Sequence, residues 1–171
     1  MKSLLLALTV LLFGIAPLAA PAAAQDNGGR LALTVGYFDI FDDDEALDVG
    51  VEYRSGTPCF WQIKPFITGH INSEGSAYAL GGIYGDIGLS DEWTLTPSLG
   101  AGLYGDGEGK DLGHTLVFRT QVELGYSFQN GSRLAGALSH MSNGGLDSHN
   151  PGTEMLTVNY SFPLQWFQSP E

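Results

Sequence analysis

Three residues near the end of the chain have the types that a serine-dependent hydrolase uses: His140, Ser142 and Glu154. A serine hydroxyl becomes a strong nucleophile when a histidine takes its proton, and a carboxylate orients that histidine and stabilises its charged form. The same residue types also fill ordinary polar loops. The chemistry therefore depends on whether the surrounding elements place all three side chains on one surface.

The first residues predict export. After a single lysine, an apolar run from Leu4 to Ile15 leads to small residues at 22–24, as in a secretory signal with its cleavage site. We expect residues 1–24 to be a signal peptide and residues 25–171 to form one domain. That domain has 171 − 24 = 147 residues, which suits a single core.

Charge and cysteine content exclude several functions. Without Lys2 the chain has 7 − 1 = 6 basic residues against 19 acidic ones, a net charge of −13. Nucleic acid is therefore not expected as a partner, because phosphate binding needs many basic side chains. Cys59 is the only cysteine and cannot form an internal disulfide. The histidines lack metal-ligand spacing, so we expect neither a metal nor a cofactor; they are His70, His114, His140 and His149.

Alternation with a period of two is the main structural signal. Between residues 116 and 128 apolar side chains share one face, which only Thr120 interrupts, and polar or small residues share the other. A helix would mix these two sets, whereas a β-strand separates them. The same pattern predicts eight strands, at residues 31–40, 46–55, 60–72, 77–89, 93–104, 113–129, 133–142 and 153–163.

The polar face of these strands distinguishes two all-β folds. A soluble sandwich buries its apolar face, whereas a membrane barrel turns that face to lipid and encloses polar side chains. Long strands, aromatic residues at strand ends and alternating short and long links favour the barrel. So do opposite charges on the polar face, at Glu52, Arg54, Lys64, Arg119 and Glu123. We predict an eight-stranded antiparallel transmembrane β-barrel of the bacterial outer membrane.

Some features do not fit this interpretation or suggest others. Pro65 and Pro97 each remove a hydrogen-bond donor from a predicted strand. Glycines in residues 100–105 match a dinucleotide-binding pattern, but no helix follows to receive a pyrophosphate. The acidic segment 41–45, Phe-Asp-Asp-Asp-Glu, lacks the spacing of a calcium loop, so we expect a solvated loop.

Strand positions place the three candidate residues on one wall. His140 and Ser142 share the face of Leu134 and Leu138, and their α-carbons stand roughly 7 Å apart at a strand rise of ~3.3 Å per residue. Glu154 shares the lipid-facing side of the next strand. Polar groups facing lipid cost free energy except near the interface. The three residues therefore belong either to a wet external rim or to an esterase site that faces lipid.

A short motif in this region resembles a known family. It runs His140-x-Ser142-Asn143-x-Gly145 and then Asn150-x-Gly152-x-Glu154. The pattern resembles the PagL-type lipid A 3-O-deacylases, which are eight-stranded outer-membrane barrels. The resemblance implies a catalytic role for His140, Ser142 and Glu154 in removing the ester-linked 3-hydroxyacyl chain at position 3 of lipid A. It makes Asn143 and Asn150, with nearby backbone N–H groups, weaker candidates for binding the oxyanion.

The resemblance also implies the partners and the compartment. These are lipid A of lipopolysaccharide, outer-membrane lipid and the outer membrane of a Gram-negative cell. The acidic loop 41–45 and the tail 163–171 are not features of the family pattern, so acyl-chain preference and the pairing of two copies as a homodimer stay open.

Two other functions also stay open. A non-enzymatic structural or adhesion barrel would leave lipid A intact, and an outer-membrane phospholipase would use similar chemistry on another ester.

Overall fold

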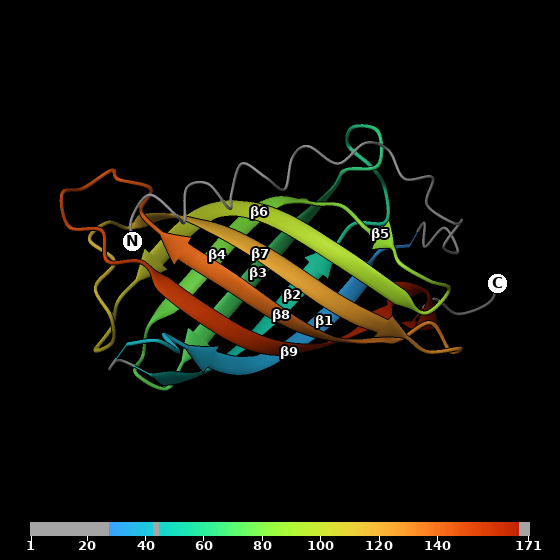
Figure 1. The fold of residues 1–171 in the computed structure, drawn as a ribbon, viewed down its shortest axis with the longest axis horizontal. Helices are drawn as coiled ribbons and strands as arrows, with labels where there is room; N and C mark the ends of the chain where they lie inside the picture. The colour runs from blue at the N-terminus through green and yellow to red at the C-terminus, as the bar shows by residue number, and fades with distance from the viewer. Residues whose placement is uncertain (1–27, 43–44, 168–171) are drawn as a thin grey trace.

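The computed structural model describes residues 28–42 and 45–167, which form a closed antiparallel β-barrel (Figure 1). The signal peptide that we predict for residues 1–24 lies outside the described residues, as do positions 43–44 of the acidic loop and 168–171 of the tail.

Nine strand segments and one short 3₁₀ helix make up the described fold. They are β1 (Arg30–Phe38), β2 (Ala46–Arg54), β3 (Lys64–Asn72), β4 (Ala77–Tyr84), β5 (Ile87–Gly88), β6 (Trp93–Gly105), β7 (Leu116–Ser127), β8 (Arg133–Ser142), β9 (Thr153–Pro163) and η1 (Leu164–Phe167). Neighbours in the chain pair antiparallel, and β1 pairs with β9 to close the barrel. β4 and β5 pair with β6 in one continuous register, so they are two parts of a single strand. The eight-stranded barrel is confirmed.

The gap between β4 and β5 lies opposite Pro97. The Gly85 N–H donates to the Pro97 carbonyl oxygen at 3.2 Å. Any other residue at position 97 would return a second hydrogen bond from its own N–H, which proline lacks. The ladder therefore opens at residues 85 and 86. Pro65 causes less disruption, because its missing donor lies at the end of the β2–β3 ladder, where Ser55 N–H donates to the Pro65 carbonyl.

The third strand is shorter than the sequence predicts. We expected a strand over 60–72, but β3 begins at Lys64. Residues 55–63 form a long connection that ends in a tight turn, where Cys59 N–H donates to the Ile63 carbonyl at 2.9 Å. Trp61 lies in that turn with a φ of 50° and is 71% exposed. The prediction of a strand is therefore wrong for residues 60–63, where the alternation of apolar residues continues through the turn.

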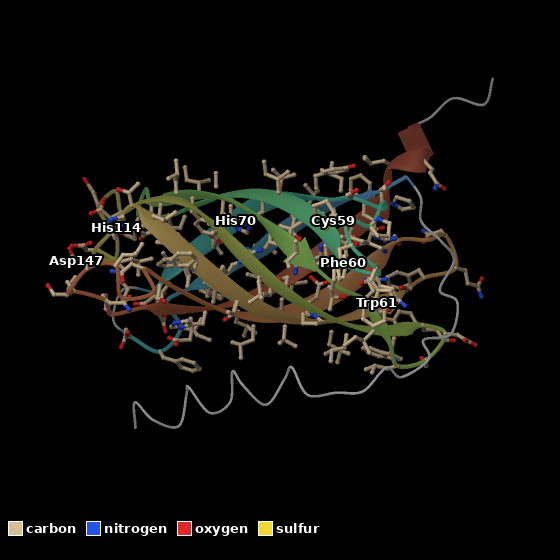
Figure 2. All side chains as sticks on the ribbon, turned by 90° about the horizontal axis from the view of Figure 1, so that it is seen from above. Cys59, Phe60, Trp61, His70, His114 and Asp147 are labelled. Atoms are coloured by element: carbon tan, nitrogen blue, oxygen red, sulfur yellow. The ribbon has the colours of Figure 1, made fainter. Side chains whose placement is uncertain are left out.

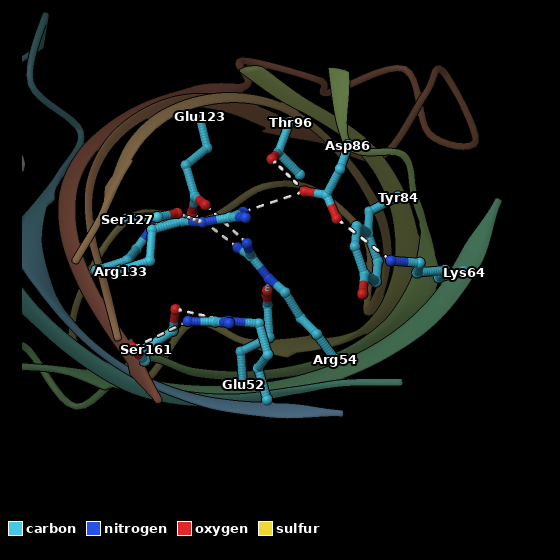
Figure 3. A network of polar contacts seen from close by, with 12 residues as sticks. Glu52, Arg54, Lys64, Tyr84, Asp86, Thr96, Glu123, Ser127, Arg133 and Ser161 are labelled. Carbon is cyan, nitrogen blue, oxygen red and sulfur yellow. Dashed lines mark hydrogen bonds and ion pairs between the residues drawn. The ribbon is translucent and has the colours of Figure 1, made fainter. Parts of the chain in front are cut away.

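Alternation directs apolar side chains outward and polar side chains inward (Figure 2). On β1, for example, Leu33, Val35 and Tyr37 are exposed. Inward-facing charges meet at the centre of the barrel (Figure 3). Arg54 donates to Glu52 at 2.6 Å and, through both terminal nitrogens, to Glu123 at 2.7 Å. Such buried charges are stable when each one is paired and hydrogen-bonded.

Further polar contacts fill the rest of the interior. Arg119 donates to the second Glu52 oxygen at 3.1 Å. Asp86, in the break between β4 and β5, accepts hydrogen bonds from Thr96 at 2.8 Å and from Arg133 at 3.1 Å. These side chains pack the barrel at this level, and they confirm the predicted paired charges inside it.

The two ends of the barrel differ. Residues 39–45, 73–76, 106–115 and 143–152 connect strands at one end, and η1 lies at the other. Figure 1 shows the orange 143–152 loop at the left end and β5 near the right end. Outer-membrane barrels have short periplasmic turns and longer extracellular loops, so we assign the end with the 106–115 and 143–152 loops as the external end. Within the described residues, no helix has the length and apolar character needed to cross a membrane.

Candidate active site

The outward wall of the described strands is almost entirely apolar. At outward-facing positions the side chains are aliphatic or aromatic, or the residue is glycine or proline, with four exceptions. These exceptions are Thr120, His140, Ser142 and Glu154. They lie together on β7, β8 and β9, which are neighbours in the sheet. The three residues that the sequence singles out therefore share one face, next to the external loops.

The β8–β9 register places His140 directly opposite Glu154. The Nδ1 atom of His140 lies 3.0 Å from Glu154 Oε1, and both side chains are partly exposed. When Glu154 is ionised it can only accept hydrogen bonds, so Nδ1 is then the donor. The Nε2 lone pair of His140 is then available to take a proton. This is the arrangement of base and orienting carboxylate in a hydrolytic triad.

Ser142 stands two residues beyond His140 on the same face of β8 and is also partly exposed. Among the described residues, no hydrogen bond joins its hydroxyl to His140. In sites without substrate, the hydrogen bond between nucleophile and base is often long and tightens only when substrate binds. β8 therefore places the two side chains on one face, but no hydrogen bond links them.

Gly152 packs against the His140 ring from the 143–152 loop. Its φ is +73°, which favours glycine, and a Cβ built on it would lie 2.8 Å from His140 Cε1. Only a residue without a side chain leaves room for the imidazole in this position. The sequence motif contains Gly152, but nothing in the sequence assigns it this role.

Asn143 organises the loop from a fully buried position. Its side-chain amide donates to the carbonyl oxygens of Leu112 at 2.9 Å and His149 at 2.8 Å, and its Oδ1 accepts from the Gly145 N–H. Both amide hydrogens are therefore used, and the side chain has none left for a substrate. The Asn143 backbone N–H donates to Asn150 Oδ1 at 3.1 Å.

The hydrogen bond from the Asn143 N–H orients the Asn150 side chain. Because the Asn150 side-chain oxygen accepts this bond, the two N–H groups of the same amide remain free to donate. Asn150 is exposed at the external rim. Its side-chain N–H groups have no hydrogen-bond partner among the described residues, whereas both amide hydrogens of Asn143 are used.

The rest of this loop is held by local hydrogen bonds. The Asp147 carboxylate accepts from the His149 N–H at 2.9 Å, and this bond lowers the pKa of Asp147. His114 and Asp147 lie together at the loop end of the barrel, far from Trp61 (Figure 2). Across residues 28–42 and 45–167, no group of three His, Cys, Asp or Glu side chains is arranged to hold a metal ion.

Comparison with known proteins agrees with this geometry. The family model for lipid A 3-O-deacylase (PagL) matches residues 60–163, which are 104 of the 171 residues. No curated protein sequence gives a significant match.

Similar solved structures include the crystal structure of the outer membrane enzyme PagL, at 18% identity and a TM-score of 0.61, over 78% of this chain and 99% of that one. Another is Neisserial surface protein A, at 8% identity and a TM-score of 0.59, over 80% and 97%. A de novo designed transmembrane β-barrel is similar at 12% identity and a TM-score of 0.57, over 79% and 94%. These likenesses bear on the fold. The family model covers more than half of the chain, including the whole 140–154 motif, and so the chain belongs to the PagL family of lipid A 3-O-deacylases.

Proposed function

We propose that Ser142, His140 and Glu154 are the catalytic triad with which this outer-membrane lipid A 3-O-deacylase hydrolyses its substrate. One observation carries the proposal. Among outward-facing residues of the described strands, His140 and Glu154 are the only charged or imidazole side chains, and they are hydrogen-bonded at 3.0 Å beside an outward serine. A wall that faces lipid has little structural use for such a group.

The proposed mechanism uses these three side chains in turn. Ser142 Oγ attacks the carbonyl carbon of the ester at position 3 of lipid A, and its proton moves to His140 Nε2. Glu154 stabilises the imidazolium through Nδ1. The tetrahedral intermediate collapses, and the sugar oxygen leaves with the proton from His140. Water activated by His140 then releases the 3-hydroxy acid and restores Ser142.

The oxyanion of the tetrahedral intermediate needs donors at the same level. Asn150 supports this role, because its amide oxygen is held by the Asn143 N–H and its N–H groups remain available. Asn143 contributes indirectly, because its hydrogen bonds hold Asn150 and the 143–152 loop in place. A single donor of this kind contributes about 10²–10³-fold to the rate.

The position of the site suits its substrate. His140 and Ser142 are among the last residues of β8 before the external loop, so the site meets the boundary between headgroups and acyl chains. Polar side chains cost little there. All the proposed site residues come from one chain, and no comparison supports a pairing of two copies.

The test is the lipid A of a Gram-negative host that expresses the full chain. Mass spectrometry should show the loss of one 3-hydroxyacyl group, and Ser142→Ala should lower deacylation by about 10⁴-fold or more. Ser148→Ala is the matched control, because Ser148 is an exposed serine of the adjacent loop, and it should act like the wild type.

Three outcomes would overturn the proposal. Unchanged lipid A with a folded barrel in the membrane would indicate a non-enzymatic barrel. Equal deacylation by Ser142→Ala would remove the serine from the mechanism. Release of a fatty acid without a hydroxyl group would indicate a phospholipase instead.

A further inference from the structure

Thr120 is the fourth polar residue on the outward wall. It is exposed on β7, between Phe118 and Val122, whose side chains are 42% and 38% exposed. The β7–β8 register places it directly opposite His140, on the side away from Glu154. Among the described residues, its hydroxyl has no hydrogen-bond partner.

A hydroxyl without a partner is unfavourable where the surroundings are apolar. The other outward positions of β7 carry aliphatic or aromatic side chains, and the one hydroxyl among them, that of Tyr126, lies at the opposite end of the strand. Threonine forms strands well, but so does valine, which would fit the same space without the hydroxyl. The hydroxyl at this one position therefore calls for a polar group that comes from outside the chain.

The register also gives the order of residues from the external end toward the membrane centre. Ser142 lies opposite Phe118, then His140 opposite Thr120, then Leu138 opposite Val122. Thr120 is thus the diagonal neighbour of Ser142, at a spacing of about 7–8 Å between α-carbons. An acyl chain that extends from Ser142 toward the membrane centre along the β7 side of the wall would therefore pass Thr120 before it reached the apolar pair below.

We propose that the Thr120 hydroxyl binds the 3-hydroxyl group of the acyl chain that is being released, and thereby makes the enzyme selective for 3-hydroxyacyl esters over plain acyl esters. The inference rests on the proposed role of Ser142. The 3-hydroxyl stands two carbons beyond the carbonyl carbon, on the part of the chain that passes Thr120. Each hydroxyl can donate to the other, so the contact satisfies both groups within an apolar wall.

The test compares two esters of the same alcohol and the same chain length. One carries a 3-hydroxyacyl chain and the other a plain acyl chain, both presented to the purified full chain in detergent micelles. Thr120→Val removes the hydroxyl and keeps the shape. It should lower kcat/KM for the 3-hydroxyacyl ester roughly five- to tenfold, the effect of one hydrogen bond. The plain ester should be hydrolysed at the wild-type rate.

Two further variants complete the test. Thr120→Ser keeps a hydroxyl and should retain most of the selectivity. Val158→Thr adds a hydroxyl to the same wall at an exposed position on β9, away from the site, and should leave the ratio of the two rates unchanged. A role in strand stability would change both esters equally, so the ratio separates recognition of the substrate from folding.

The outcomes distinguish the two proposals. If Ser142→Ala still hydrolyses both esters, the triad is refuted, and the Thr120 assignment falls with it. If Ser142→Ala is inactive but Thr120→Val keeps the wild-type ratio, the triad stands and the assignment of Thr120 is overturned.

Discussion

Gly152 offers a sharp test of how the loop positions the catalytic histidine. Replacing it with alanine adds a Cβ that would lie 2.8 Å from His140 Cε1. Carbon atoms in contact are normally ~3.5 Å apart or more, so the ring or the loop must move by about 0.7 Å. The backbone adds a second cost, because alanine at a φ of +73° is strained by about 1–2 kcal/mol.

Displacing His140 should affect catalysis far more than stability. A misplacement of about 1 Å in a reacting group costs on the order of 10²-fold in rate. We therefore expect Gly152→Ala to lower kcat for lipid A deacylation between about tenfold and a hundredfold, while KM changes little. The barrel should still fold, because the strain is confined to an external loop.

The matched control is Gly145→Ala. Gly145 lies in the same loop at a φ of +84°, but a Cβ there has open space around it. It should bear the same backbone strain without moving His140, and its deacylation rate should stay close to that of the wild type. Urea unfolding of both variants would measure the shared strain, and mass spectrometry of lipid A would measure the rates. A wild-type rate in Gly152→Ala, or equal losses in both variants, would refute the steric argument.

Two further predictions concern the loops around the site. Asn150→Ala should lower kcat about 10²-fold in a fully folded barrel, and equal rates in wild type and Asn150→Ala would contradict the oxyanion role. Asn143→Ala should instead increase protease cleavage of the 143–152 loop, because it removes three hydrogen bonds, one buried and two partly buried. Lys110 tests pH dependence: burial by itself would lower its pKa, but hydrogen bonds to Asp39 and Asp42, at 2.6 Å each, outweigh burial and raise the pKa above 10.5. Because the pKa of Lys110 is raised in the folded state, its ion pairs contribute their full stability below the unfolded pKa, and this stability is lost as the pH rises through the folded pKa. Protease resistance of the wild-type 106–115 loop should therefore hold to about pH 10 and fall above it. Lys110→Met should be cleaved faster at neutral pH and should lose that alkaline step.

Much of the architecture could be predicted because strand alternation is a local property. Each pair of neighbouring residues in a strand points to opposite faces whatever the partner strands are. The apolar and polar sets along residues 116–128 therefore identified the wall and the interior. The same alternation placed His140 and Ser142 on one face.

Other features depended on contacts that local patterns do not contain. The turn at 59–63 continues the apolar alternation of β3, so its residues looked like part of the strand. The break at residues 85 and 86 arises from Pro97, which lies on the neighbouring strand. Asn143 is part of the motif, but its hydrogen bond to Leu112 joins two loops 31 residues apart in sequence.

The sequence by itself determined that this chain forms an outward-apolar barrel and that a histidine, a serine and a glutamate face outward near its last connection. Only the tertiary structure decided that His140 faces Glu154 at 3.0 Å, that Gly152 leaves room for the imidazole, and that Thr120 stands on the far side of the same ring. The reason is physical. The direction of a side chain is set by its own strand, whereas the neighbours of that side chain are set by the register between strands and by the packing of loops, which involve residues far apart in the chain.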